Sequence, residues 1–112
     1  MEIKLPGFGY PKTMFARELA TRVRDFKISR QGTEMQLVFT NNSFLLFRHD
    51  LLGRWCRASG YEAEQLWQQV ADYQAIAGGL AMRMKDGSEV EITREGMLVE
   101  VQISRATPRH IA

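Results

Sequence analysis

The sequence predicts an α+β fold of two units, each a helix followed by three strands. Apolar residues recur at helical spacing in residues 13–24 and 59–77, and they alternate with polar residues in the segments after each. The chain has 112 residues, 45% of them hydrophobic, which suits one packed domain. We expect residues 1–104 to form a single domain of antiparallel sheet with both helices packed on one face. Residues 105–112 are expected to form a flexible tail.

The first unit should begin with an extended arm over residues 1–11, where proline and glycine interrupt regular structure. A helix is predicted over Thr13–Arg24. Four residues recur every three or four positions and predict its apolar stripe: Phe15, Leu19, Val23 and Phe26.

Alternation then predicts strands at 26–29 and 34–40, with a third strand after Asn41-Asn42. This pair favours a two-residue hairpin turn, because both residues tolerate positive φ. The turn would set Phe39 opposite Phe44, with both side chains facing inward. The same register leaves an apolar patch on the other face, made of Val38, Leu45 and Phe47. Such a patch predicts a covering element or a partner.

Residues 48–58 predict a short helix or an ordered loop that gathers basic side chains around Trp55. These are Arg48, His49, Arg54 and Arg57. Arginine and tryptophan often dominate protein interfaces, so the cluster is a candidate binding site.

Ser59–Ala77 carries the clearest helical pattern in the chain. Its apolar stripe comprises Ala63, Leu66, Val70, Tyr73 and Ala77. Ser59 and Glu62 fit a capping box, and Gly78-Gly79 predict the end of the helix. Trp67 lies on the flank of the stripe and is a further candidate interface residue.

A second three-strand meander is expected over residues 80–103. Here a three-residue loop, Lys85-Asp86-Gly87 with Gly87 left-handed, pairs Met82 with Val90 and keeps each face uniform. The segment 31–37 resembles 86–92, which suggests a duplicated unit with a spacing of 55 residues.

Charge is divided unevenly along the chain. The net charge is +2, but residues 1–60 carry ten Lys/Arg and five Asp/Glu, whereas residues 61–112 carry five and eight. This asymmetry indicates either an anionic partner for the first part or two parts that complement each other between copies. Cys56 is the only cysteine and the N-terminus lacks the apolar segment of a signal peptide, so a cytoplasmic location is expected. No apolar run is long enough to predict a membrane span.

No catalytic, metal or cofactor motif stands out. His49 and Asp50 are adjacent, so on a regular element they point apart, and His110 lies in the expected tail. Two histidines and Cys56 show no metal-ligand spacing, and phosphate and dinucleotide motifs are absent from the sequence. We expect a protein that is not an enzyme and needs no cofactor.

These features predict a small non-catalytic protein-binding or adaptor module of chaperone- or regulator-like character. Its expected partner is another protein or a second copy of itself in a homodimer. Its predicted contact residues are Val38, Leu45, Phe47, Arg54, Trp55, Arg57 and Trp67.

The alternative is a nucleic-acid-binding regulator. Its predicted contacts are Arg17, Arg24, Arg48, Arg54 and Arg57, with Trp55 for base stacking. A helix-turn-helix over residues 52–66 is disfavoured, because the exposed side of its second helix would carry Glu62, Glu64 and Asp72.

Overall fold

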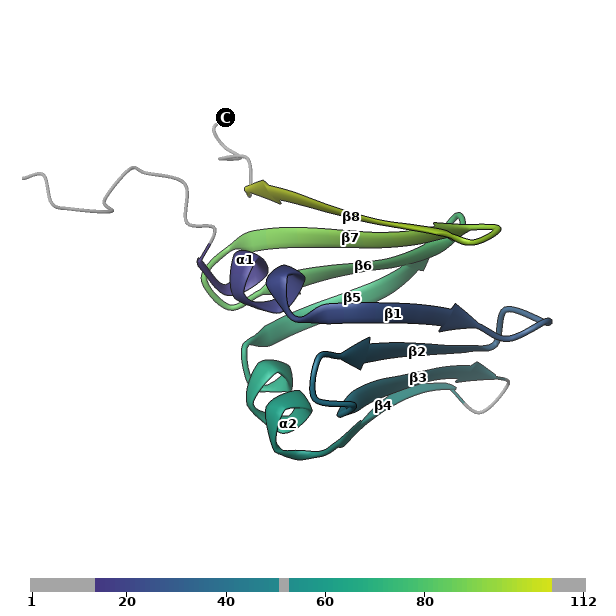
Figure 1. The fold of residues 1–112 in the computed structure, drawn as a ribbon, viewed down its shortest axis with the longest axis horizontal. Coiled ribbons are helices and arrows are strands. Elements are labelled where there is room, and N and C mark those ends of the chain that lie inside the picture. The colour runs from purple at the N-terminus through teal and green to yellow at the C-terminus, as the bar shows by residue number, and fades with distance from the viewer. Residues whose placement is uncertain (1–13, 51–52, 106–112) are drawn as a thin grey trace, which may run out of the picture.

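The computed structural model describes residues 14–50 and 53–105 (Figure 1). Two short helices alternate with two four-stranded antiparallel sheets, whose strands lie in sequence order. The elements are α1 (Met14–Thr21), β1 (Val23–Ile28), β2 (Glu34–Phe39), β3 (Phe44–Asp50), β4 (Gly53–Ser59), α2 (Tyr61–Trp67), β5 (Val70–Ile76), β6 (Gly79–Met84), β7 (Ser88–Glu95) and β8 (Leu98–Arg105). The expected arm over residues 1–11 and residues 106–112 of the expected tail lie outside the described residues, whereas Arg105, where that tail was to begin, ends β8.

The α+β class and the antiparallel sheets are confirmed, but the prediction of three strands per unit is wrong. In the first sheet, the additional strand is β4, and β3 continues through Arg48 and His49 to Asp50. Residues 48–50 and 53–58 therefore lie in two paired strands, and not in the predicted short helix or ordered loop. A helix-turn-helix over residues 52–66 is also ruled out, because its first helix would have to occupy β4.

Both helices end earlier than predicted, for one shared reason. β1 and β5 each carry a bulge directly after their first residue, between Val23 and Asp25 and between Val70 and Asp72. A bulge adds one residue, so two inward side chains stand three positions apart instead of two. Val70 and Tyr73 thus imitate one turn of a helical stripe although they belong to a strand.

The predicted ends of the central helix also change. Ser59 ends β4, and Gly60 precedes α2 as its N-cap with φ 101° and no side-chain capping bond. Gly78, with φ 75°, turns the chain between β5 and β6. Gly79 lies so close to β7 that a Cβ atom there would stand 1.9 Å from the carbonyl oxygen of Ile92. The two glycines therefore make a tight hairpin and a close strand contact instead of a helix end.

The turn between β2 and β3 has three residues, Thr40-Asn41-Asn42, and not the predicted two. Asn42 takes the left-handed position, with φ 71°, and the N–H of Phe39 donates to the carbonyl of Ser43 at 2.8 Å. Val38 therefore pairs with Phe44, one residue away from the predicted register. A shift of one residue exchanges the faces of a strand. The predicted apolar patch is thus wrong for Leu45 and Phe47, which are both buried in the core.

The corresponding prediction in the second sheet is confirmed. Lys85-Asp86-Gly87 forms a three-residue loop with Gly87 left-handed at φ 89°, and Met82 pairs with Val90.

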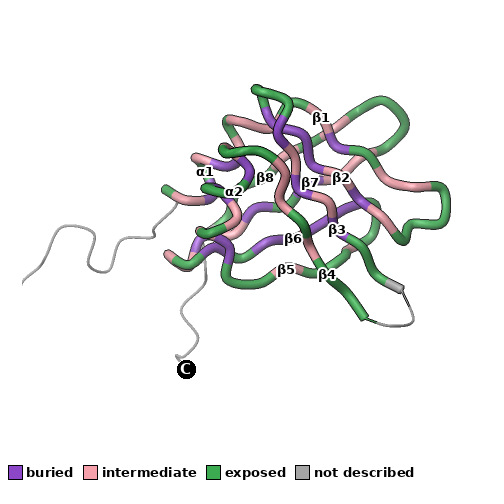
Figure 2. The backbone as a smooth tube through the Cα atoms, turned by 90° about the horizontal axis from the view of Figure 1, so that it is seen from below, coloured by how far each residue is buried: buried purple, intermediate pink, exposed green. Residues whose placement is uncertain are grey.

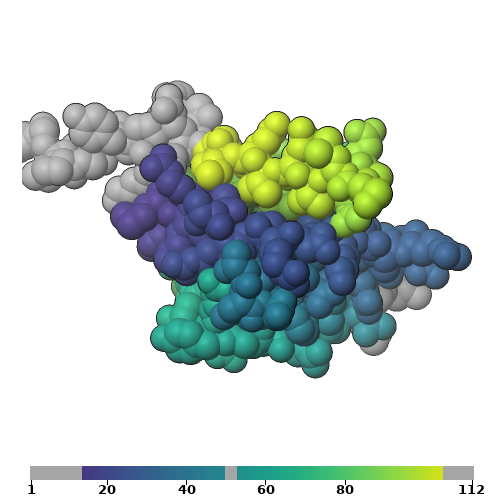
Figure 3. All heavy atoms as spheres, viewed as in Figure 1, coloured from purple at the N-terminus to yellow at the C-terminus, as the bar shows by residue number. Residues whose placement is uncertain are grey.

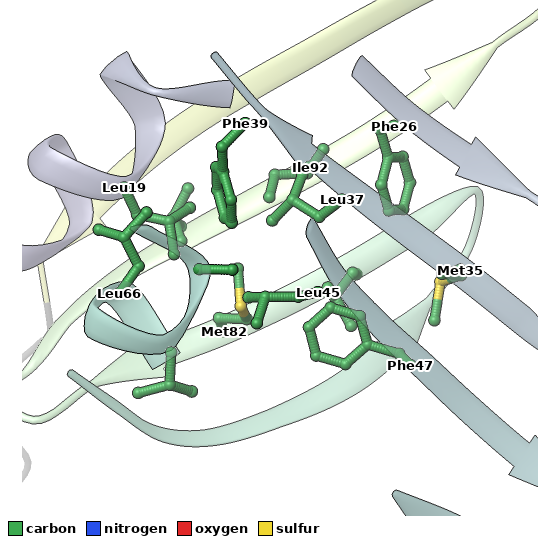
Figure 4. Packing of buried hydrophobic residues seen from close by; sticks show 14 of the residues in the cluster. Leu19, Phe26, Met35, Leu37, Phe39, Leu45, Phe47, Leu66, Met82 and Ile92 are labelled. Atoms are coloured by element: carbon green, nitrogen blue, oxygen red, sulfur yellow. The ribbon is translucent and has the colours of Figure 1, made fainter. Parts of the chain in front are cut away.

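The core lies between the inner faces of the two sheets and both helices (Figure 4). Leu19 of α1 and Leu66 of α2 meet large side chains from both sheets. In Figure 2 the buried positions follow the middle of the strands, while the turns are exposed. The sheets contribute Phe26, Met35, Leu37, Phe39, Leu45 and Phe47 on one side and Leu80, Met82, Met84, Val90 and Ile92 on the other.

The chain divides into two halves with the same order of elements, residues 14–59 and 61–105. Each helix packs against the sheet of the other half: α1 contacts β6, β7 and β8, and α2 contacts β3 and β4. Figure 3 shows the purple and blue start of the first half lying against the yellow-green end of the second. The halves are therefore interlocked by an exchange of helices.

The halves also share residues. Residues 14–26 align with 61–73, 47 positions later, and the identical pairs are Ala16/Ala63, Leu19/Leu66, Val23/Val70 and Asp25/Asp72. Backbone bonds repeat as well: Thr40 N–H donates to the Arg22 carbonyl at 2.9 Å, and Lys85 N–H donates to the Gln69 carbonyl at 2.7 Å. In both turns a serine N–H donates a hydrogen bond of 3.0 Å to a side-chain oxygen two residues earlier. Ser43 donates to Asn41, and Ser88 donates to Asp86.

The repeat predicted at a spacing of 55 residues aligned the wrong strands. Residues 34–37 lie in β2, whereas residues 88–92 lie in β7, the third strand of its sheet. The structural counterpart of β2 is β6, 45 positions later.

Candidate functional site

The outward side of the first sheet forms a surface that combines apolar and cationic side chains. Cross-strand pairing aligns its members in rows: Lys27 with Gln36, Leu46 with Arg57, and Arg48 with Trp55. We call this surface the basic face. It comprises Lys27, Glu34, Gln36, Val38, Phe44, Leu46, Arg48, Trp55, Arg57 and Ser59.

Trp55 is the most exposed apolar residue of the basic face, at 40% exposure. The guanidinium carbon of Arg48 stands 5.9 Å from the centre of its ring, within cation–π range. Arg48 also lies 3.4 Å from the Glu34 carboxylate. The neighbouring positions Phe44 and Leu46 are half-buried, whereas Val38 is only 6% exposed. The centre of this face therefore offers apolar area between charged side chains.

The structure separates the predicted protein-contact residues. Val38, Trp55 and Arg57 lie on the basic face, while Leu45 and Phe47 point into the core. The shift of register also brings Phe44 and Leu46 to the surface, which sequence reasoning missed. The outward position of Phe44 and Leu46 follows from the three-residue turn before them. The sequence predicts a turn of this length at Lys85-Asp86-Gly87 but not at Thr40-Asn41-Asn42.

Arg54 binds within the molecule, at the corner where β4 meets β5. Its Nη2 lies 3.2 Å from Asp72 Oδ1, its Nη1 donates to the carbonyl of Tyr73, and its guanidinium carbon stands 4.7 Å from the Tyr73 ring centre. The pKa of Asp72 lies below its usual value, mainly because its carboxylate accepts a hydrogen bond from the N–H of Tyr73. The charge of Arg54 lowers it further. Arg54 therefore joins the two sheets.

Trp67 is also packed internally. Its ring lies 5.8 Å from Phe47 and 5.6 Å from Tyr73, centre to centre, both in edge-to-face arrangements. Such contacts stabilise the junction of α2 with both sheets.

The residues predicted for nucleic-acid contact do not form one surface. Arg48 and Arg57 share the basic face with Lys27, which the sequence reasoning did not single out. Arg24, at the bulge of β1, donates to Asn42 Oδ1 at 2.7 Å, and Arg17 lies on the exposed side of α1. Arg54 belongs to the corner between the sheets.

The outward side of the second sheet carries the opposite charge. We call it the acidic face, made of Gln74, Ile76, Ala81, Arg83, Glu89, Glu91, Thr93, Glu100, Gln102 and Ser104. Among these residues it holds three carboxylates and one cation, while the basic face holds three cations and one carboxylate. The registers add Asp25 at the edge of the basic face, and Asp72 and Glu95 at the edges of the acidic face. A shallow hollow of about 190 Å³ lies on it, bordered by Gln74, Ala81, Glu89 and Glu91 among others.

Among the side chains that the structure describes in the first sheet, Cys56 and His49 have no hydrogen-bonded acid–base partner. Burial raises the pKa of the Cys56 thiol to about 12, so it stays protonated and unreactive at neutral pH. His49 lines an apolar hollow of about 270 Å³ together with Tyr73, but no hydrogen bond joins the two side chains among the described residues.

In residues 14–50 and 53–105, no three histidine, cysteine or carboxylate side chains gather in a way that could hold a metal ion. Neither described helix is long and apolar enough to cross a membrane.

Comparison with known proteins adds no family. The chain matches no family model, and searches of curated proteins and of solved structures find no match.

Proposed function

We propose that this chain is a small non-catalytic binding module whose basic face holds an acidic, partly apolar partner protein. One observation carries the proposal. At equivalent positions of the two halves, 45 residues apart, the basic face has Phe44, Leu46 and Trp55 where the acidic face has Glu89, Glu91 and Glu100. The inward positions of both sheets stay apolar, so the difference lies in the surfaces.

An apolar centre rimmed by cations matches what protein interfaces use. Trp55 supplies a large, partly exposed ring, and Arg57 and Lys27 supply charge beside it. An acidic partner with leucine or aromatic side chains would satisfy both parts of this surface. The cytoplasmic location expected from the single cysteine belongs to the same proposal.

Titration of the isotope-labelled chain with a twelve-residue peptide of alternating glutamate and leucine tests this function. We expect amide shifts confined to residues 44–48 and 54–58. Trp55→Ala should weaken binding about tenfold, the size of effect typical of an interface hot spot. Tyr61→Ala, which removes an exposed ring from α2, is the matched control and should leave binding unchanged. Shifts spread over the surface, or none at millimolar peptide, would refute the proposal.

Single-stranded nucleic acid is the second candidate, favoured by the exposed ring of Trp55 among arginines. We give it second place because the basic face has three cations, of which Arg48 already contacts Glu34. A twelve-nucleotide single-stranded DNA of mixed sequence separates the candidates. Binding that falls steeply with salt and is lost in Arg57→Glu, without binding of the peptide, would support nucleic acid instead.

A further inference from the structure

The basic face and the acidic face lie on opposite outer sides of the molecule. The inner sides of the two sheets share the core, so the two outer sides face away from it. The strands beneath the two faces correspond one to one, and the registers of β2 with β3 and of β6 with β7 are equivalent. The two faces thus have matching backbones and opposite charge.

We propose that the basic face of one copy docks on the acidic face of a second copy, head to tail. This inference rests on the proposed function and names the acidic partner as another copy of the chain. Pairing of two basic faces would oppose like charges, and so would pairing of two acidic faces. Only the mixed pairing sets Lys27 and Arg57 against Glu89, Glu91 and Glu100, since Arg48 is already engaged by Glu34 and Trp55.

Shape supports the same pairing. Trp55 projects from the basic face, whereas the acidic face carries the shallow hollow beside Glu89 and Glu91. Ala81 lies in that hollow, and around it three carboxylates, Asp72, Glu89 and Glu91, outnumber the one cation, Arg83. The carboxylates beside it would meet Arg57, which follows Trp55 on the same side of β4.

The size of the faces sets the strength of the contact. Strand rise and strand spacing make each face roughly 20 Å by 15 Å, or about 300 Å² per copy, which is smaller than a standard specific interface. Association should therefore be weak and sensitive to salt. A head-to-tail pair also leaves one face of each kind uncovered, so pairs should extend into longer assemblies or rings as concentration rises. The homodimer expected from the sequence would be the first step.

Sedimentation of the full chain between 10 μM and 1 mM, in low and in high salt, measures this association. We expect the mean mass to rise with concentration in low salt and to fall back toward that of one chain in high salt. Two double variants reverse one face each: Lys27→Glu with Arg57→Glu, and Glu89→Lys with Glu91→Lys. Each variant alone should associate at least about tenfold more weakly than the natural chain.

Mixing the two variants gives the decisive result. The unaltered acidic face of the first and the unaltered basic face of the second remain complementary, and so do the two reversed faces. The mixture should therefore form mixed assemblies that neither variant forms alone. The same recovery shows that both variants are folded. Arg30→Glu in the β1–β2 turn and Glu64→Lys on α2 are matched controls and should associate like the natural chain.

Three results would overturn the inference: a natural chain that stays single at 1 mM in low salt, variants that associate as strongly as the natural chain, or a mixture that stays unassembled. If the natural chain stays single while the glutamate–leucine peptide still shifts residues 44–48, self-docking fails and the binding module stands. If the peptide shifts nothing and the chain stays single, both fail.

Discussion

Asp25 and Asp72 occupy equivalent places in the two halves, and each is bound by an arginine from the opposite sheet. Arg94 Nη1 lies 3.2 Å from Asp25 Oδ1, and Arg54 Nη2 lies 3.2 Å from Asp72 Oδ1. Both arginines also donate to the carbonyl of the residue after the aspartate, and both carboxylates accept the N–H of that residue at 2.8 Å. The two sheets are thus joined at two corners by the same arrangement.

The two corners should differ in strength. The side chains of Arg94 and Asp25 are 30% and 36% exposed, compared with 49% and 54% for Arg54 and Asp72. Asp25→Ala should lower the free energy of unfolding by about 1–2 kcal/mol, because it removes a partly shielded charged hydrogen bond. Asp72→Ala should lower it less, since solvent screens that pair. Urea unfolding measures both, and a larger loss from Asp72→Ala would contradict this reading.

Asp86 should make stability depend on pH. Burial alone would raise its pKa, but hydrogen bonds from the Ser88 hydroxyl, the Phe15 N–H and the Ser88 N–H outweigh burial and hold the pKa below its usual value. A depressed folded pKa stabilises the fold above the unfolded pKa of about 4, and this contribution is lost as pH falls through the folded value.

Asp86→Asn should therefore lower the free energy of unfolding at pH 7 by about 1 kcal/mol, which is the usual effect of removing a side chain that caps a helix. The difference from the natural chain should shrink between pH 5 and pH 2. Glu64→Gln removes a carboxylate on the exposed side of α2 and is the control, with no expected loss at pH 7. A gap between Asp86→Asn and the natural chain that stays constant with pH would count against this role.

The exchange of helices predicts that the two halves unfold together. Leu19 and Leu66 are both fully buried, each against the sheet of the other half. Leu19→Ala and Leu66→Ala should each cost about 2–5 kcal/mol and should each shift one single transition. Circular dichroism and tryptophan fluorescence during urea unfolding should therefore coincide. Two separate transitions in either variant would show that the halves are independent.

Gly79 should tolerate no side chain. A Cβ atom there would stand 1.9 Å from the Ile92 carbonyl oxygen and 2.8 Å from the Cα of Thr93, and both are backbone atoms that cannot rotate away. Gly79→Ala should cost about 3 kcal/mol or more, because β6 and β7 must separate. Gly32→Ala is the control, because its Cβ would meet nothing within 4 Å. Only the strain of a left-handed φ of 74° should lower the free energy of unfolding there, by about 1 kcal/mol. Equal losses in thermal unfolding would disprove the steric argument.

The two tryptophans should separate stability from binding. Trp67→Ala removes ring contacts with Phe47 and Tyr73 and should cost about 2–4 kcal/mol of stability. Trp55→Ala leaves the core untouched and should change stability by less than about 0.5 kcal/mol while weakening peptide binding. Thermal unfolding and the peptide titration, run on both variants, check this division. A large stability loss in Trp55→Ala would mean that its ring is structural.

Sequence reasoning identified the class of fold but misplaced the helix ends, and the bulges explain why. Val23 and Phe26, like Val70 and Tyr73, are three residues apart and both inward, which is a helical spacing produced by a strand irregularity. Their repetition 47 residues apart was the missing signal. Because the same misleading spacing occurs in both halves, it indicates that the bulge itself is repeated.

The candidate site depended on a single turn. Asn41-Asn42 fits a two-residue hairpin by composition, yet the loop begins at Thr40, and this moved Leu45 inward and Leu46 outward. The residue types of the turn allow both registers, and only its likeness to the Lys85-Asp86-Gly87 loop favours the observed one. The uneven charge along the chain is visible in the sequence. Its separation onto two sheet faces depends on the strand registers and is seen only in the structure.

The helix exchange also orders events during synthesis. Ala16 donates its N–H to the Ser88 hydroxyl, a partner 72 residues further along the chain. A nascent chain that has emerged only as far as β4 has a helix without its sheet and a sheet without its helix. Its apolar inner surface is covered first by α2 and then by the second sheet, so the core is complete only after β6 and β7 have been made.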